Sequence, residues 1–473
     1  MSSVNIYEDR RIAIKIFLTV FLISGFFFKP DLTFARFEFL TKALTQYGTT
    51  WIDKVEQESG IKIFDSLTLN GHTFIEPTPG LSFIALASYL PYAVFLQSRL
   101  IRLFSLDPLL EFKLSQFIMA LSTVILFTAL LITVFFLSLR RLGCTQKKAI
   151  VFSFLLYFGT PIISYSLNVT NGQDILEASL LYSAFFVICI SKMQNINLIF
   201  LSGLLSGLAI FVNAVAVSFL PLFLSIIILA KRWRNIVPWI IGVILGVAPL
   251  LIYNQISFGN LWRISYSAKY GKFISFGLGG YLDIARIFLV SPTIGLLFFF
   301  PFAVILALKF KNIWVNPINK LILFTLVIYT GGLCIIQQFL NVALGFGSTW
   351  YLSQGGAGPR YLLPIIPFLL YAVASIRFEL KWEKILAAWL IFISVIINTP
   401  GLFWTGGRPI FYNNLLLFLK NGFHSYMADL IRDILVKGGF NTGRFSMFPL
   451  LVILGIFLWW IWAGNRWIRR RLQ

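Results

Sequence analysis

The sequence predicts an all-α integral membrane protein that crosses the bilayer many times. Of its 473 residues, 58% are hydrophobic and only 12% are charged, so polar side chains are too few to cover a surface that faces water all round. Long apolar runs recur along the chain, and short groups of Lys and Arg separate them. Since no polar stretch is long enough for an ordinary soluble domain, we expect residues 1–473 to form a single integral membrane domain.

The positions of the basic residues predict which connections face the cytoplasm. The net charge is +21. Lys and Arg gather in the short connections at 140–148, 231–234, 309–320 and 466–471. Short basic loops are typical of the cytoplasmic side of a membrane, and Arg10 and Arg11 indicate the same side for the N-terminus. We expect no nucleic-acid partner, because topology explains these charges better than a basic binding patch does.

Twelve membrane-spanning helices, with both termini in the cytoplasm, satisfy this placement of the basic connections. We expect them near residues 12–28, 114–139, 148–166, 174–191, 197–212, 214–231, 235–253, 287–308, 320–340, 361–376, 383–398 and 447–464. The pair within 197–231 is divided only around Asn213, and one bent helix is the alternative there.

The apolar run at 81–96 is expected to lie outside this set. It contains Pro91 and is short for a span, because about 30 Å of hydrocarbon needs about 20 residues of helix. If it crossed the membrane as well as 114–139, the cluster at Arg140 would face outward. We therefore expect an interfacial or re-entrant segment on the outer face.

This topology leaves four substantial outer loops, at 29–113, 254–286, 341–360 and 399–446. In the last of them, apolar residues recur at helical spacing from Met427 to Leu435, which predicts an amphipathic helix lying on the membrane surface. The first loop holds half of all the acidic residues: Asp31, Glu38, Asp53, Glu56, Glu58, Asp65, Glu76, Asp107 and Glu111. Carboxylates held close to a bilayer tend to be functional, so we expect the chemistry on this side.

Residue types that bind metals through nitrogen or sulfur are scarce. The three cysteines, Cys144, Cys189 and Cys334, form no C-x-x-C pair, and His72 and His424 lie far apart in the sequence. Neither a thiolate site nor a histidine site is expected. No cofactor is required by the sequence, and a divalent cation stays open.

Several short motifs follow one another in order along the chain. The first loop contains Asp31, R-F at 36–37, A-L at 43–44, Gly48, Asp65, N-G-H at 70–72 and E-P-T-P-G at 76–80. Further motifs are F-G-T-P at 158–161, Y-N-x-x-x-F-G at 253–259, S-P-x-x-G-L-L at 291–297 and G-P-R-Y-L at 358–362. Together they resemble the GT-C glycosyltransferases, especially the family 39 branch with protein O-mannosyltransferases and the lipid A aminoarabinose transferase. The likeness extends to about residue 370.

The resemblance implies an enzyme that transfers a sugar from a polyprenyl-phosphate carrier to an extracytoplasmic acceptor, which is a protein, a lipid or a glycan. It also implies a bacterial inner membrane. In such families an acidic residue just after the first span acts as general base, and Asp31 is the nearest match. Asp31 stands five residues before Arg36, however, where the aminoarabinose transferase pattern has its acid three before. Asp31, Glu38 and Asp65 therefore remain rivals for the base.

The same resemblance indicates residues that bind substrate. Pro77 stands where relatives often carry a lysine, so we expect Arg360, with Lys269 or Lys272, to bind the donor phosphate. Arginine suits this role because its planar fork matches phosphate oxygens. The other candidates for substrate binding are Arg36, His72, Glu76, Tyr270 and Tyr361.

Simpler roles and other functions stay open. His72 is expected to hydrogen-bond within its loop, Glu76 to cap the segment that follows, and Asp174 with Glu177 to stabilise the N-terminus of a span. A transporter or flippase of lipid-linked sugars is the main alternative. It predicts ionisable residues in the middle of spans and an internal repeat, and neither is obvious. The other alternative is a homologue that binds such a lipid without catalysis.

Overall fold

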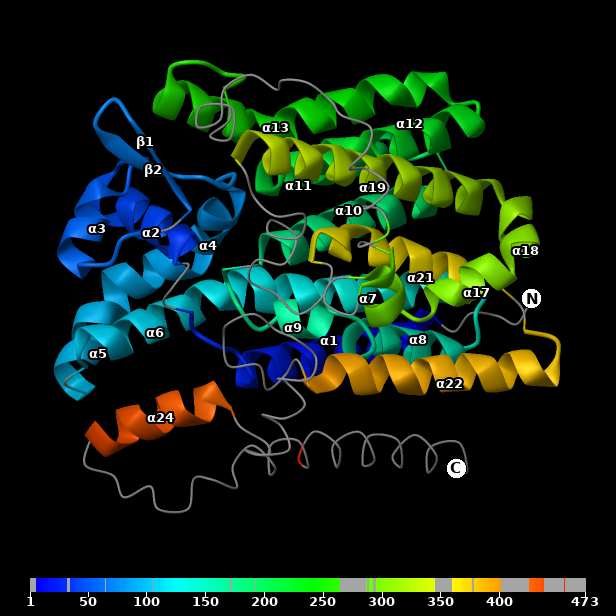
Figure 1. Ribbon diagram of the computed structural model, residues 1–473, viewed down its shortest axis with the longest axis horizontal. Helices are drawn as coiled ribbons and strands as arrows, with labels where there is room; N and C mark the ends of the chain where they lie inside the picture. The colour runs from blue at the N-terminus through cyan, green and yellow to red at the C-terminus, as the bar shows by residue number, and fades with distance from the viewer. Residues whose placement is uncertain are drawn as a thin grey trace.

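The computed structural model describes most of the chain. The described residues are 6–31, 35–63, 65–104, 106–170, 172–191, 193–263, 286, 289–291, 295–344, 360–376, 378–400, 425–437 and 455. Among them, helices dominate, and the one sheet is a two-stranded hairpin (Figure 1). The expected all-α character is confirmed for these residues.

The body of the protein is a bundle of helices that run along its long axis (Figure 1). These are α1 (Ile6–Phe26), α7 (Leu126–Arg141), α8 (Gln146–Phe158), α10 (Gln173–Ile190), α11 (Ile196–Val212), α12 (Leu220–Leu229), α13 (Ile236–Phe258), α19 (Pro317–Leu344), α21 (Ile366–Ala374) and α22 (Lys381–Asn398). The π-helical turn η3 (Leu121–Ile125) joins α6 (Pro108–Ala120) to α7, so that one 34-residue helix runs from Pro108 to Arg141.

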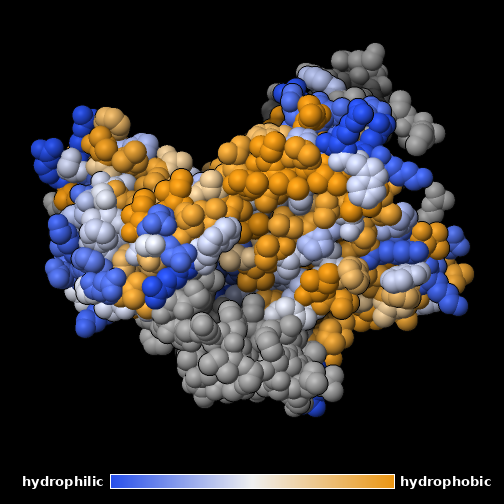
Figure 2. Space-filling view, turned by 90° about the horizontal axis from the view of Figure 1, so that it is seen from above, coloured by the Kyte–Doolittle hydropathy of each residue, from blue (hydrophilic) through white to orange (hydrophobic). Residues whose placement is uncertain are grey.

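Four helices of the described chain are long and apolar enough to cross a membrane: Gly80–Phe104, Pro108–Arg141, Gln173–Ile190 and Trp233–Phe258. A hydrophobic surface covers the middle of the bundle, and hydrophilic side chains gather toward its two ends (Figure 2). On α13, for example, Val237 is 62% exposed and Ile244 is 58% exposed. Apolar side chains so exposed suit contact with lipid rather than water. The protein is therefore membrane-embedded.

The expected count of twelve spans is not established by the described residues. The expectation of one continuous helix at 287–308 is wrong. The described residues between 295 and 315 form three short helices instead: α16 (Leu296–Phe299), α17 (Ala303–Leu308) and α18 (Phe310–Val315). Pro301, which lacks a backbone N–H, separates the first two. The span expected at 447–464 lies outside the described residues apart from position 455.

Two other expected spans are interrupted. The first, at 148–166, consists of α8 and the short α9 (Ile162–Tyr165), which Pro161 separates. The second, at 214–231, begins as the 3-10 helix η4 (Ala214–Phe219) before α12. The expected division at Asn213 is confirmed, because this residue leaves the helical conformation with φ −148° and ψ 117°.

The first outer loop folds into a small layer at one end of the bundle. It comprises α2 (Arg36–Lys42), η1 (Ala43–Tyr47), α3 (Asp53–Ser59), β1 (Ser66–Leu69), β2 (His72–Ile75), α4 (Gly80–Pro91), η2 (Tyr92–Leu96) and α5 (Gln97–Phe104). The strands form an antiparallel hairpin that pairs Ser66 with Ile75. Asn70 and Gly71 form its turn with positive φ angles of 51° and 79°. A two-residue type I′ hairpin turn requires positive φ at both positions.

The length expected for the segment at 81–96 is wrong. The helix continues from Gly80 to Phe104 over 25 residues and is one of the four long enough to cross a membrane. Pro91 does not end it, because the π-helical turn η2 follows directly and carries the chain into α5. In Figure 1 this helix lies obliquely at the end of the bundle beside the hairpin.

The basic connections meet at the opposite end. Arg140 Nε lies 2.7 Å from Asp9 Oδ1, which joins the end of α7 to the start of α1. Lys148 donates to the carbonyl oxygen of Ala374 at 2.8 Å, and Lys309 forms an ion pair with Glu383 at the start of α22. The hairpin and the helices α17 and α18 accordingly occupy opposite ends of the molecule (Figure 1).

The helices α11 and α13 pack at very short range. Their contact places Gly203 and Gly207 against Gly242 and Gly246. A Cβ atom at Gly203 would lie 2.1 Å from the backbone oxygen of Trp239. Such G-x-x-x-G pairs allow helix backbones to approach closely in a membrane.

The amphipathic helix expected in the last outer loop is confirmed as α24 (Tyr426–Lys437). Its apolar side chain Leu430 packs against Leu106 and Leu110 of the first loop, so this face rests on protein as well. The Ser425 hydroxyl donates to the carbonyl oxygen of Phe26 at 2.6 Å, which fixes the start of α24 to the end of α1.

Candidate functional site

Three segments that lie far apart in the sequence meet at one end of the bundle. They are the residues after α1, the connection between α9 and α10, and the 3-10 helix η6 (Arg360–Ile365) that precedes α21. The backbone N–H of Lys29 donates to the carbonyl oxygen of Leu167 at 2.7 Å, which joins the first two. Lys29 itself is buried, and burial lowers the pKa of its ammonium group well below the usual range.

Asp31 is held at this junction by two amide side chains. Its backbone N–H donates to Gln116 Oε1 at 2.8 Å, and Gln116 Nε2 donates to its carbonyl oxygen at 2.6 Å. Its carboxylate accepts a hydrogen bond from Asn168 Nδ2 at 3.4 Å. The backbone of this half-buried acid is therefore fixed, and its carboxylate lies next to the connection between α9 and α10.

Arg36 and Asp65, both expected from the sequence, form an ion pair. Arg36 is only 3% exposed, and its Nη2 also donates to the carbonyl oxygen of Thr170 at 3.2 Å. The pair thus connects α2, the start of the hairpin and the connection that leads into α10. The carboxylate of Asp65 therefore holds the guanidinium group of Arg36 in position.

Glu38 belongs to a different set of contacts. It is 1% exposed, accepts a hydrogen bond from Ser115 Oγ at 2.6 Å and lies 3.2 Å from Lys42 Nζ. Lys42 also lies 3.5 Å from Glu111. Burial raises the pKa of Glu38 to about 7, although the positive charge of Lys42 opposes this shift. These contacts give Glu38 a structural role between α2 and α6.

Arg360 opens η6 and is buried at 8% exposure. Its Nε lies 3.6 Å from Asp174 Oδ2, and its guanidinium carbon lies 4.5 Å from the ring centre of Tyr361. Arg360 also donates to the Tyr361 hydroxyl. The backbone oxygen of Tyr361 in turn accepts a hydrogen bond from the hydroxyl of Tyr329 at 2.7 Å. The expected phosphate-binding arginine is therefore fixed by neighbours from α10 and α19.

Asp174 is the ion-pair partner of Arg360. It is fully buried in the first turn of α10, and the positive charges of both Arg360 and Arg36 act on it. Glu177, one turn later, is also fully buried and accepts a hydrogen bond from Asn213 Nδ2 at 2.7 Å. The expectation that these acids only stabilise the N-terminus of a span is too narrow, since both are interior groups with side-chain partners.

His72 contacts other residues of the first loop, and Glu76 contacts the group through the backbone of Asp65. His72 Nδ1 lies 3.0 Å from Asp53 Oδ2, and its ring stacks on Trp51 at 4.5 Å. The expected hydrogen-bonding role in the loop is confirmed. Glu76 is buried, and its backbone N–H donates to the carbonyl oxygen of Asp65 at 2.9 Å. The N-cap position of α4 is occupied by Pro79.

The E-P-T-P-G motif instead attaches the first loop to the bundle. Thr78 donates to the carbonyl oxygen of Val212, the last residue of α11. A Cβ atom at Gly80 would lie 2.6 Å from the backbone oxygen of Phe211, so only glycine allows this approach. The motif thereby seats α4 on the end of α11, directly before Asn213.

Sequence reasoning did not predict Asp174 as a member of this group, nor the neighbouring contacts of Asn168, Asn213 and Lys29. Signals were present, since Asn213 marks a helix break and Asp174 follows the motif N-V-T-N-G-Q. Lys269, Tyr270 and Lys272 lie outside the described residues. Among the residues that the structure describes, no three His, Cys, Asp or Glu side chains are grouped to hold a metal ion.

The group combines two fixed guanidinium groups with carboxylates at the end of an apolar bundle. Guanidinium groups bind phosphate oxygens, and a carboxylate accepts a proton from a hydroxyl group. We call this group, made of Asp31, Arg36, Asp65, Asp174 and Arg360, the arginine–carboxylate site. No protein-family model, curated protein or solved structure matches this chain.

Proposed function

We propose that this protein is a membrane glycosyltransferase that moves a sugar from a polyprenyl-phosphate carrier to an extracytoplasmic acceptor. The observation that carries the proposal is that Asp31, Arg36 and Arg360 all contact the segment from Asn168 to Asp174: Asp31 through Asn168, Arg36 through the carbonyl oxygen of Thr170, and Arg360 through Asp174. Asp31, Arg36 and Arg360 come from segments whose motifs resemble the GT-C glycosyltransferases. An apolar carrier tail suits a site that lies at the end of a lipid-embedded bundle.

Asp31 is the general base in this proposal. Asp65 is engaged by Arg36, and Glu38 is engaged by Ser115 and Lys42. The acceptor hydroxyl oxygen bonds to the anomeric carbon of the sugar as its proton passes to Asp31. The bond from that carbon to the phosphate oxygen breaks, and its electron pair leaves with the polyprenyl phosphate.

Arg36 and Arg360 stabilise the leaving phosphate. The negative charge on its oxygens grows as the bond to the sugar breaks, and fixed cations at that position lower the barrier. Asp174 and Asp65 hold the two guanidinium groups before the donor arrives. No step of the proposal uses a metal ion.

The test is a transfer assay with the protein purified into lipid nanodiscs. Radiolabelled polyprenyl-phosphate sugars serve as donors, and extracted membranes serve as acceptors. We expect Asp31→Asn to lower transfer by roughly 10² to 10⁴ and Arg360→Gln by roughly 10² to 10³. The matched control is Asp53→Asn, another first-loop carboxylate, whose contacts are with His72 and Thr73. It should retain transfer.

Two results would contradict the assignment. Transfer that survives Asp31→Asn would exclude Asp31 as the base. Absence of transfer from every donor, with all variants folded, would favour the alternative of a transporter for lipid-linked sugars. The buried carboxylates of Asp174 and Glu177 inside the bundle are the observation that keeps this alternative in view, because such groups often mark transport pathways. Movement of labelled carrier between leaflets would then be measured.

A further inference from the structure

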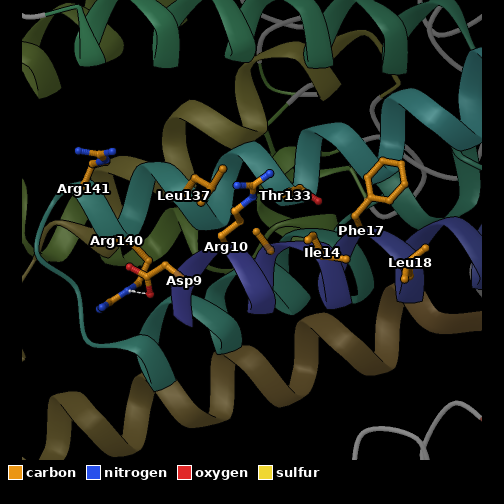
Figure 3. Close-up of a pocket in the computed structure, with 10 residues that line it drawn as sticks. Asp9, Arg10, Ile14, Phe17, Leu18, Thr133, Leu137, Arg140 and Arg141 are labelled. Atoms are coloured by element: carbon orange, nitrogen blue, oxygen red, sulfur yellow. Dashed lines mark hydrogen bonds and ion pairs between the residues drawn. The ribbon is translucent and has the colours of Figure 1, made fainter. Parts of the chain in front are cut away.

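A groove of about 480 Å³ lies at the other end of the bundle, between α1 and α7 (Figure 3). Its walls are formed by Asp9, Arg10, Ala13, Ile14, Phe17, Leu18, Thr133, Leu137, Arg140 and Arg141. It belongs to the end where the basic connections meet, far from the arginine–carboxylate site. None of the roles proposed above uses it.

The groove is apolar along most of its length. Ile14 and Leu18 are 53% and 39% exposed, and they follow each other along the outer side of α1 with one helical turn between them. Phe17 and Leu137 complete this wall (Figure 3). A surface of this kind within a membrane-embedded bundle suits the acyl chain of a lipid.

The mouth of the groove is positively charged. Arg140 turns toward Asp9 and forms an ion pair with it, whereas Arg10 and Arg141 point away from that pair (Figure 3). Both are exposed, and in the described part of the chain no carboxylate lies within ion-pair distance of either. Arg140 and Asp9 neutralise each other, so Arg10 and Arg141 give the mouth a net positive charge.

We propose that this groove binds an anionic diacyl phospholipid from the surrounding leaflet. Its phosphate lies between Arg10 and Arg141, and one acyl chain follows Ile14, Phe17 and Leu18. Basic pockets between membrane helices are suited to anionic lipid head groups, and guanidinium groups bind phosphate oxygens in pairs of hydrogen bonds. The charged mouth of the groove matches the phosphate of such a lipid, and the apolar wall matches its acyl chain.

The first experiment counts bound lipid by native mass spectrometry. The full-length protein in detergent is titrated with phosphatidylglycerol or with phosphatidylcholine of identical acyl chains. We expect one phosphatidylglycerol to bind at least about tenfold more tightly than phosphatidylcholine. The double variant Arg10→Gln/Arg141→Gln should lose this preference. The control variant Lys231→Gln/Arg232→Gln removes two exposed charges from the connection between α12 and α13 and should keep it.

A second measurement locates the lipid. Phosphatidylglycerol with a photoreactive acyl chain should label the peptides that contain Ile14 to Leu18 and Thr133 to Leu137. Equal affinity for the two lipids, or an unchanged preference in the double variant, would overturn the proposal. Loss of the preference in both double variants would also overturn it, since general surface charge would then explain the binding. So would labelling confined to other helices.

Discussion

Glu38 is a buried carboxylate whose charge state changes near neutral pH. Burial raises its pKa to about 7 in the folded protein, whereas an exposed glutamate titrates near about 4.3. Between these values the folded protein keeps the proton on Glu38 and the unfolded chain releases it. The contribution of Glu38 to stability is therefore full below about pH 4 and is lost as the pH rises to about 7.

The variant Glu38→Gln tests this titration, because glutamine resembles the protonated acid at every pH. We expect the wild-type protein to lose stability relative to the variant between about pH 5 and about pH 7, by up to about 3 kcal/mol. Thermal unfolding of both proteins in detergent, followed by tryptophan fluorescence, measures the difference. A difference that stays constant over this range would show that Glu38 is already ionised in the folded protein.

The sequence predicted some residues of the arginine–carboxylate site better than others. Asp31, Arg36 and Asp65 occupy motif positions. Asp31 and Arg36 contact the connection between α9 and α10, and Asp65 pairs with Arg36, which agrees with a shared site. Asp174 looked like an ordinary acid at a helix N-terminus. Its role depends on Arg360, which is 186 positions away in the chain, and no local pattern in a single sequence encodes such a contact.

The close contact between α11 and α13 predicts how Gly→Ala changes affect the stability of the protein. Alanine has a higher helix propensity than glycine by about 1 kcal/mol, so a Gly→Ala change in an uncrowded helix is neutral or stabilising. At Gly203 the added Cβ would lie 2.1 Å from a backbone oxygen of α13, whereas at Gly331 in α19 it would meet no atom within 4 Å. We expect Gly203→Ala to lower the thermal midpoint and Gly331→Ala to leave it unchanged or raise it.

Thermal unfolding of the two purified variants measures both midpoints. The expected loss for Gly203→Ala is roughly 1 to 3 kcal/mol, the usual cost of overpacking. If Gly203→Ala raised the midpoint as well, helix propensity would outweigh the close contact, and α11 and α13 would have room to separate.

For the individual helices, the apolar runs in the sequence predicted where a helix lies better than they predicted where it begins and ends. The apolar run at 81–96 is short for a span and contains Pro91, yet α5 continues the helix to Phe104. The hairpin was not expected, although Asn70 and Gly71 are a strong turn signal between short alternating stretches. The break at Asn213 was expected correctly, because its side chain accepts the N–H of Val215 and begins η4.

The two ends of the whole molecule make a prediction about membrane sidedness. Ser59 is exposed at the end of α3 in the first loop, and Arg232 is exposed in a basic connection at the other end. After Cys144, Cys189 and Cys334 are replaced, single cysteines are introduced as Ser59→Cys or Arg232→Cys. In sealed right-side-out vesicles, a membrane-impermeant maleimide should label only the first variant.

Permeabilised vesicles provide the control, in which both cysteines should react. Labelling of Arg232→Cys in sealed vesicles, with Ser59→Cys protected, would reverse the orientation and place the arginine–carboxylate site in the cytoplasm. Lipid-linked donors would then have to be drawn from the inner leaflet.

For the whole chain, composition predicted the membrane-embedded helical character, because 58% hydrophobic residues leave no other stable surface. The number of spans was less accessible. Placing every basic connection on the cytoplasmic side gives the number of crossings only when each apolar run forms one helix. The region around Pro301 contains several short helices instead.

The docking of α24 has a consequence for the order in which the protein is made. Ser425 contacts Phe26 across 399 positions of the chain, and a ribosome adds roughly 5 to 20 residues per second. The partner of α24 on α1 therefore waits roughly 20 to 80 s for it after its own synthesis, and the partner on α6 somewhat less. During that interval Leu106 and Leu110 lack the cover of Leu430. Seating of α24 is a late step of biogenesis, and nascent chains stopped before it would present this surface to lipids and chaperones.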